Sequence, residues 1–319
     1  MTKPVLFYHP NSESSNEIRI DWSMGNEVDF YVPYLHRDFQ RGDKPFPSKE
    51  TIMQFFYNVN QSQRITNSNR VLNWKLLGGE VTRHPEFLEI AREISSESGG
   101  LHIHSCGTRP QEFWEEATQY LSHVTFDWHP EWVSEDQLMQ VIETLQDTAW
   151  DIETWINPDN YTFCQEAKES IQHKTDTKAN QRLVFKDVNR NIGDYSEEHT
   201  EELKNEEDTD GFVCVHNDYS VEYINHNAMA IDRRRCFTNW LCNAGVDQII
   251  IDMQGDIWRG WCFIQKLGTI YDDKFELPDQ PIQCDRVACY NGFDQISMKW
   301  DPDVDPEEVL LFAQKNKSS

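Results

Sequence analysis

The sequence lacks long apolar runs and is poor in basic residues. No apolar run approaches the length of a membrane-spanning helix, so a membrane protein is not expected. Asp and Glu number 55 against 29 Lys and Arg, which gives a net charge of −26. A chain this acidic repels phosphate backbones, which argues against nonspecific nucleic-acid binding. The same acidity would attract a basic protein partner or keep the chain in solution.

A secretory signal and a regular cysteine framework are also missing. No signal-like segment precedes Lys3 and Pro4, and the eight cysteines are irregularly spaced. Disulfides persist in oxidising compartments, whereas cytosolic thiols stay reduced. We therefore expect a cytoplasmic protein with reduced cysteines.

Strand and helix patterns alternate through the first two thirds of the chain. Apolar or alternating segments predict strands at 71–77, 101–105, 124–128, 150–156 and 182–188. Capped segments with helical periodicity lie at 48–59, 84–90, 110–120, 134–145 and 159–173. This alternation is typical of parallel βαβ units and predicts an α/β fold. A doubly wound sheet and a (β/α) barrel would both produce it.

Two motifs favour the barrel. Gly78-Gly79-Glu80 comes directly after the predicted strand at 71–77. An earlier segment, residues 25–36, resembles the loop that binds an iron–sulfur cluster in one enzyme superfamily. Together they resemble the radical SAM superfamily, in which three loop thiolates hold an iron–sulfur cluster. In that family the Gly-Gly-Glu motif receives the amino group of S-adenosylmethionine (SAM).

The resemblance implies a partial (β/α)6 TIM-like barrel with ligands at the C-terminal ends of its strands. It implies SAM as a possible cofactor, bound by Gly78, Gly79 and Glu80. The loop, however, carries hydrophobic side chains where the family has its three cysteines: Val28, Val32 and Leu35. Hydrophobic side chains cannot replace thiolate ligands, so classical radical SAM activity is not expected. Asp29 and His36 lie in the same loop but do not reproduce a three-thiolate set.

The C-terminal third carries a second resemblance. Apolar strands flank a turn at Gly255, which predicts a β-hairpin around residues 252–256. Four cysteines surround it: Cys242, Cys262, Cys284 and Cys289. The arrangement is similar to the SPASM or twitch extension of radical SAM enzymes, a small α+β cysteine domain. This implies one auxiliary [4Fe–4S] cluster on these four residues.

Other interpretations of the cysteines stay open. Four cysteines are also a structural zinc set. Free cysteine is in addition among the most buried residue types, so the four could be ordinary core. The remaining cysteines are expected to be structural: Cys106, Cys164, Cys214 and Cys236.

Acid–base candidates lie near the end of the predicted strand at 124–128. Asp127 and His129 correspond to a substrate-facing position in the family, and with Glu80 they form the candidate catalytic set. His102 and His104 share one face of their strand, because alternate residues point to the same side. We expect that pair to line a polar barrel interior rather than to bind a metal.

These features predict three segments: a barrel at 1–195, an acidic linker or helix at 196–210, and a cysteine domain at 211–319. The leading hypothesis is a degenerate radical-SAM-like protein that binds a ligand or regulates an active paralogue. A second hypothesis keeps an enzyme that uses SAM or the cluster in non-radical chemistry. A third is an interaction protein in which the four-cysteine site is a staple.

Overall fold

Two β-sheets organise the chain. The computed structural model describes residues 2–10, 17–24, 47–65, 71–145, 148–185, 191–206, 211–289 and 291–316. The first sheet has nine strands in the order β13-β12-β11-β2-β3-β4-β5-β6-β7, and the second has six in the order β14-β10-β15-β1-β8-β9. Among the described residues, no helix combines the length and the apolar character needed to cross a membrane.

The first sheet contains a run of parallel strands that neighbour one another in sequence order. They are β2 (Glu17–Ser23), β3 (Val71–Leu77), β4 (Leu101–Ser105), β5 (Leu121–Trp128), β6 (Ala149–Ile156) and β7 (Ala179–Leu183). The connecting helices are α1 (Lys49–Ile65), α2 (Phe87–Ser98), α3 (Gln111–Ala117), α4 (Glu135–Leu145) and α5 (Tyr161–Thr175). Short 3-10 helices are η3 (Val81–Arg83) and η4 (Pro158–Asn160). The expected mixed α/β fold with a parallel sheet is therefore present.

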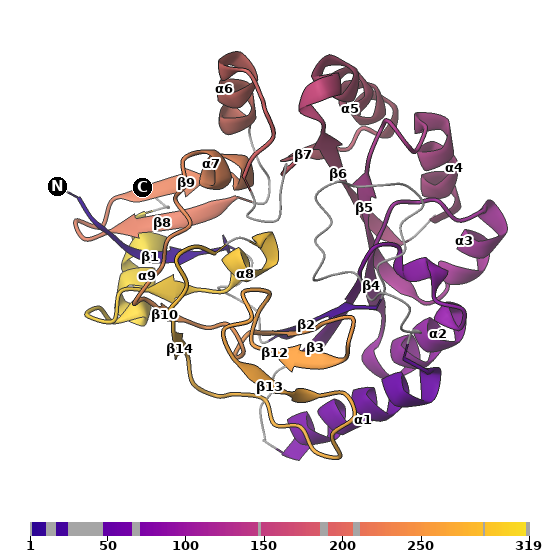
Figure 1. The fold of residues 1–319 in the computed structure, drawn as a ribbon, viewed down its shortest axis with the longest axis horizontal. Helices are drawn as coiled ribbons and strands as arrows, with labels where there is room; N and C mark the ends of the chain where they lie inside the picture. The colour runs from indigo at the N-terminus through magenta and orange to yellow at the C-terminus, as the bar shows by residue number, and fades with distance from the viewer. Residues whose placement is uncertain are drawn as a thin grey trace.

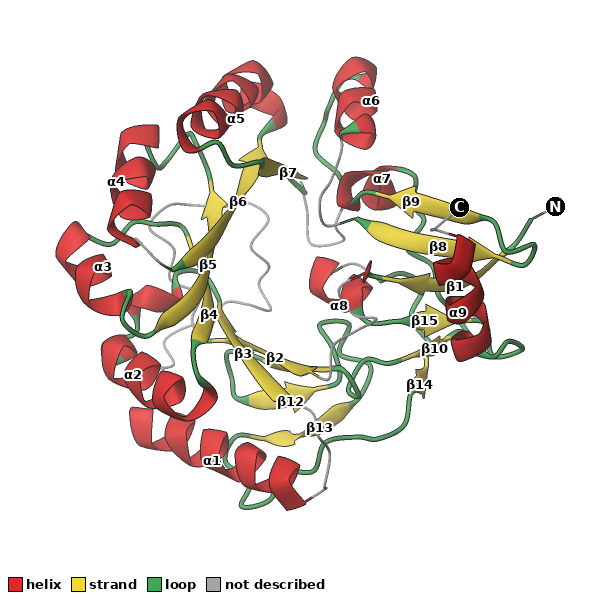
Figure 2. Cartoon of the chain, turned by 180° about the vertical axis from the view of Figure 1, so that it is seen from behind, coloured by secondary structure: helices red, strands yellow, loops and turns green. Residues whose placement is uncertain are grey.

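Helices α1 to α5 all lie on the outer side of the curved sheet in both views (Figures 1 and 2). The reason is visible in β3, where Trp74 points to the helices and contacts Phe55 and Phe56 of α1. The even-numbered residues of β3 are buried, and burying each large apolar side chain contributes about 1.5–3 kcal/mol. The apolar stripe predicted for α4 is likewise buried: Leu138, Val141, Ile142 and Leu145.

The second sheet is antiparallel. Its strands are β14 (Ile282–Gln283), β10 (Leu241–Cys242), β15 (Lys299–Trp300), β1 (Pro4–Tyr8), β8 (Phe212–His216) and β9 (Val221–Ile224). The remaining helices are α6 (Glu197–Asn205), α7 (His226–Ile231), α8 (Gly292–Ile296) and α9 (Pro306–Asn316). Helix α9 covers β1, with Val309 and Ala313 buried against Val5 and Leu6.

Each sheet contains strands from both the N-terminal and the C-terminal part of the chain. Strand β1 lies between β15 and β8 of the second sheet. Strand β11 (Gln248–Ile251) pairs in parallel with β2 and continues the first sheet into β12 (Asp256–Trp258) and β13 (Lys266–Thr269). The predicted hairpin is confirmed, with Ile251 opposite Ile257 and Gly255 at φ 84°. The three-segment division stays a prediction, and strand pairing crosses it in both directions.

One side chain occupies the free edge of β7. The Asn227 side chain accepts a hydrogen bond from the Leu183 backbone N–H (3.1 Å) and donates one to the Gln181 carbonyl (3.0 Å). Asn227 belongs to α7, which lies beside β7 in Figure 1. The amide therefore satisfies the two backbone groups that a neighbouring strand would use.

Candidate functional site

Glu80 joins the C-terminal ends of β3 and β4. Its carboxylate accepts hydrogen bonds from the Thr82 backbone N–H (3.1 Å) and hydroxyl (2.5 Å). The Ser105 hydroxyl (3.0 Å) and the Cys106 backbone N–H (2.8 Å) donate from the end of β4. Burial raises the pKa of Glu80, and these donors act in the opposite direction. The carboxylate is thus held by the protein, and its role toward SAM stays a prediction.

The two glycines before Glu80 end β3 without side chains. Gly78 has φ 142°, a value that favours glycine over other residues, and both glycines are half-buried. The backbone at this strand end is therefore accessible to a bound molecule. Strand β2 ends beside it, because the Met24 N–H donates to the Leu77 carbonyl (2.8 Å).

Ionisable side chains form pairs on the face of strands β4 to β7 that points away from helices α1 to α5. The pairs are His104 with Asp127, His123 with Asp151, and Arg182 with Glu153. Burial alone would raise the pKa of Glu153, but the Arg182 guanidinium holds it at about 2. His102 packs against His104 and His123, with ring centroids 5.6 and 4.4 Å away. The histidines on alternate residues of β4 therefore do share a polar layer.

His129 lies just beyond β5. Its ring stacks on Trp155, with centroids 5.7 Å apart and planes 7° from parallel. Burial lowers the pKa of His129 to about 4, against a smaller opposing effect of Asp127. The imidazole is therefore neutral at pH 7, so it can act as a proton acceptor but does not carry the second ring proton that an imidazolium could donate.

The three candidate catalytic residues lie at one end of the sheet: Glu80 follows β3, Asp127 is the second-last residue of β5, and His129 follows β5 directly. Burial raises the pKa of the Cys106 thiol strongly, and both Glu80 and Asp127 add to the effect. Asp127 also acts on His129. The structure thus brings the acid–base candidates into one electrostatic neighbourhood, as expected for C-terminal strand ends.

The four cysteines of the C-terminal third come from different segments. Cys242 ends β10, Cys262 lies between β12 and β13, and Cys284 follows β14 directly. All but Cys262 are buried. Burial raises the pKa of the Cys289 thiol, and Cys242 and Cys284 contribute to the rise. The four thiols therefore share one neighbourhood.

Backbone hydrogen bonds reach two of these sulfurs. The Ala244 N–H donates to Cys242 Sγ over 3.4 Å. Burial raises the pKa values of Cys262 and Cys284. A backbone hydrogen bond from Ile264 opposes the rise in Cys262, whereas the Cys284 thiol donates to the Arg286 carbonyl over 3.9 Å. Such donors stabilise thiolate over thiol. The sulfurs of Cys242 and Cys262 thus accept backbone hydrogen bonds, as metal-bound thiolates do, although burial has the larger effect on their pKa values.

A buried lysine and a buried aspartate lie near the cysteines. Lys299 is 2% exposed, and its ammonium donates to the carbonyls of Asp294 and Ser297 at 2.6 Å each. Burial opposes the charge, yet Cys242 and Cys289 together with Asp294 raise the pKa of Lys299. The Asp294 carboxylate accepts from the backbone N–H groups of Trp261 (2.7 Å) and Cys262 (2.6 Å). A positive charge and a fixed loop thus face the sulfurs.

The spacing of the four thiols tests which metal group they fit. Four sulfurs on one tetrahedral zinc lie about 3.8 Å apart, because Zn–S bonds are about 2.3 Å. In the part of the chain that the structure describes, no three of these sulfurs lie within 4.8 Å of one another. The four sulfurs are therefore not preformed as a tetrahedral zinc set.

Some sequence-based residues cannot be placed, and others were missed. Val28, Asp29, Val32, Leu35 and His36 lie outside the described residues. Sequence reasoning missed Lys299 and Asp294, which carry no motif of their own. It also treated Cys214 as structural, although Cys214 and His216 share a strand face by simple alternation.

Comparisons with known proteins were made for sequence and for structure. No protein-family model matches the sequence, and no curated protein matches it. Native anSMEcpe with bound AdoMet matches 80% of this chain and 78% of its own, with 12% identity and a TM-score of 0.48. Streptococcus suis SuiB bound to S-adenosylmethionine matches 81% of this chain with 13% identity and a TM-score of 0.52.

The match covers 64% of the SuiB chain, so this chain corresponds to less than two thirds of that protein. Identity this low establishes fold rather than activity. The nine-stranded, largely parallel sheet with its connecting helices therefore has the mixed α/β fold found in Streptococcus suis SuiB.

Proposed function

We propose that this protein is a degenerate radical-SAM-like protein that acts by binding rather than by radical chemistry. The observation that carries the proposal is the combination of that fold with Val28, Val32 and Leu35 in the loop that would hold the first cluster. Without three thiolates no cluster is held there to reduce SAM. The protein would then act as a regulatory or substrate-presenting partner of an active paralogue, or bind a basic protein through its acidic surface.

The curved sheet supports an open (β/α)6 barrel as its scaffold. Helices on the outer face alone are typical of barrels, whereas a doubly wound sheet carries helices on both faces. The inner face offers the paired charges described above, and the strand ends offer the backbone of Gly78 and Gly79. This is where SAM or a related amino compound would bind, with its ammonium near the acidic strand ends.

We further propose one auxiliary [4Fe–4S] cluster on Cys242, Cys262, Cys284 and Cys289. The shared neighbourhood of the four thiols supports a metal group on them, and the absence among the described residues of three of these sulfurs within 4.8 Å of one another argues against a preformed site for a single zinc ion. When bound, such a cluster supplies one-electron chemistry. Lys299 would balance the negative charge of the thiolates, and Asp294 would hold the Cys262 loop in place.

The charged inner face also supports a second candidate, an enzyme that uses SAM or the cluster in non-radical chemistry. Asp127, hydrogen-bonded to His104 over 2.9 Å, and neutral His129 would be its acid–base groups. The third candidate, an interaction protein with a cysteine staple, needs neither SAM binding nor turnover.

Metal analysis is the first test. Iron, acid-labile sulfide and zinc should be measured on anaerobically purified protein. We expect about four irons and matching sulfide per chain. The Cys242→Ser and Cys289→Ser variants should lose both, while Cys164→Ser, a buried cysteine far along the chain, should retain them. Iron beyond one cluster would contradict the degenerate loop, and zinc alone, lost in Cys242→Ser, would favour the staple.

The second test restores the missing ligands. With SAM and a strong reductant, the natural protein should form no 5′-deoxyadenosine. A Val28→Cys/Val32→Cys/Leu35→Cys variant, reconstituted with iron and sulfide, should gain iron and form it. A matched triple serine variant should do neither. Formation of 5′-deoxyadenosine by the unaltered chain would overturn the proposal, whereas SAM turnover without it would favour the second candidate.

A further inference from the structure

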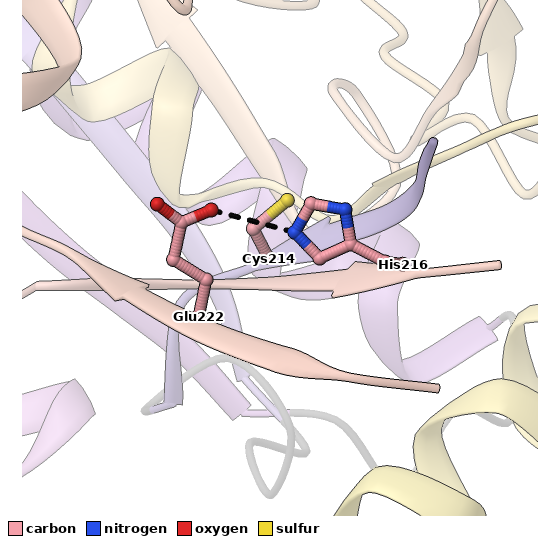
Figure 3. Close-up of side chains that lie close together, drawn as sticks. All are labelled: Cys214, His216 and Glu222. Atoms are coloured by element: carbon pink, nitrogen blue, oxygen red, sulfur yellow. Dashed lines mark hydrogen bonds and ion pairs between the residues drawn. The ribbon is translucent and has the colours of Figure 1, made fainter. Parts of the chain in front are cut away.

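Three metal-ligating side chains that belong to neither site above converge on the β8–β9 hairpin. Cys214 and His216 alternate along β8, and Glu222 of β9 lies directly opposite Cys214. Figure 3 shows the thiol, the imidazole and the carboxylate turned toward one another. Their ligand atoms all lie within 4.8 Å of each other. No other triplet of this kind occurs in the described part of the chain.

The spacing suits one small ion better than a hydrogen bond. His216 Nε2 and Glu222 Oε2 are 3.4 Å apart, which is long for a strong hydrogen bond. Two ligands on one tetrahedral zinc, with bonds of about 2.0–2.2 Å, lie roughly 3.3–3.6 Å apart. Thiolate, imidazole and carboxylate are each zinc ligands, and three of them leave a fourth position for water.

The three side chains differ in burial, and the most exposed one leaves a path from solvent to the buried thiol. Cys214 is 3% exposed, the His216 side chain is 14% exposed and the Glu222 side chain is 41% exposed. An ion could therefore enter past Glu222 and reach the buried sulfur. The Nδ1 atom of His216 is itself buried and has no hydrogen-bond partner among the described residues.

Arg234 pairs with the negatively charged Glu222 carboxylate of this cluster. Both of its terminal nitrogens contact the Glu222 carboxylate, one of them at 2.6 Å. Burial raises the pKa of Cys214 to about 11, and Arg234 opposes the rise while Glu222 adds to it. The Arg234 side chain is 29% exposed, so it can turn to solvent when another cation replaces it.

We propose that Cys214, His216 and Glu222 form a binding site for a zinc-like divalent cation, with Arg234 as its competitor. On binding, the S–H bond of Cys214 breaks, the proton passes to solvent and a sulfur–metal bond forms, with no change in oxidation state. The ion would tie the two strands of the hairpin together and keep one exchangeable position. This inference does not depend on the function proposed for the four-cysteine site.

Cobalt titration tests the site, because Co²⁺ bound to a thiolate absorbs in the near ultraviolet, and it is done on the full-length Cys242→Ser protein so that the four-cysteine set does not contribute. In this background we expect a charge-transfer band that adding Cys214→Ser or His216→Gln abolishes. Cys164→Ser is the matched control for loss of a buried thiol, and circular dichroism checks that each variant is folded. Zinc should displace the cobalt and remove the band.

Arg234 provides the decisive variant, because it changes charge without removing a ligand. Arg234→Gln should bind Co²⁺ and Zn²⁺ about tenfold more tightly, since a like charge next to the ion is removed. Two results would overturn the inference: a thiolate–cobalt band that survives Cys214→Ser unchanged, or an Arg234→Gln affinity equal to or weaker than that of the natural protein. Either can be seen even if one ligand variant fails to fold.

Discussion

At the scale of single residues, His129 links the strand-end site to pH. Its pKa of about 4 lies below the ordinary value near 6.5, so the unfolded chain binds a proton before the folded one. The free energy of unfolding should therefore fall as the pH drops from about 6.5 to 4, by as much as about 3 kcal/mol. Urea unfolding across this range measures it. In His129→Gln the slope should be shallower, and an unchanged slope would rule out the buried neutral ring.

Arg182 and Glu153 form a pair whose halves depend on each other. Arg182→Met leaves the mostly buried Glu153 carboxylate without its counter-charge and should destabilise the protein by roughly 2–3 kcal/mol. Adding Glu153→Gln should restore most of that loss, because the unpaired charge is then gone. Denaturant unfolding of the two single variants and the double variant gives the coupling, and simple additivity would contradict it.

At the scale of elements, the hairpin after β11 depends on one glycine. Gly255 has φ 84°, and a Cβ there would lie 2.7 Å from Ile270 Cγ1. Gly255→Ala should cost about 1–2 kcal/mol from the left-handed backbone alone, and the contact adds to it. Thermal unfolding measures the loss. Gly99→Ala, also at positive φ but with open space around its Cβ, separates the backbone cost from the contact.

The elements that sequence predicted best are those with a clear apolar period. The strand at 71–77 and the helix at 134–145 match β3 and α4 within a residue, because each buries one regular face. The predicted strand at 182–188 is displaced, since β7 begins at Ala179. Its segment is polar: Gln181 and Arg182 are buried through side-chain partners, which no local pattern indicates.

The candidate site likewise contains residues that local sequence patterns predict and residues that only distant contacts place. Glu80 and Asp127 could be located because strand ends are predictable from pattern, and parallel strands bring their ends together. Lys299 and Asp294 could not, because their burial depends on contacts across distant segments. The Cys214 cluster requires the β8–β9 register, which fixes Glu222 opposite Cys214 only once the hairpin is formed.

At the scale of the whole molecule, the two sheets should depend on each other. Strand β1 completes the second sheet, and β11 pairs with β2 in the first. A fragment of residues 1–195 should therefore leave β1 unpaired and β2 with β3 as its one neighbour, and it should unfold at lower denaturant than the full chain. Circular dichroism and hydrogen exchange of the fragment test this. A fragment as stable as the intact protein would show that residues 1–195 fold independently.

The Asn227 amide at the edge of β7 has a consequence for assembly. A parallel sheet that ends in an open strand can template another chain, by strand addition or by self-association. Because Asn227 already engages Gln181 and Leu183, an incoming peptide would have to displace it before it could pair there. Among the described residues the nine-stranded sheet thus ends at β7, where the Asn227 amide takes the place of a neighbouring peptide group and makes strand addition at this edge less favourable.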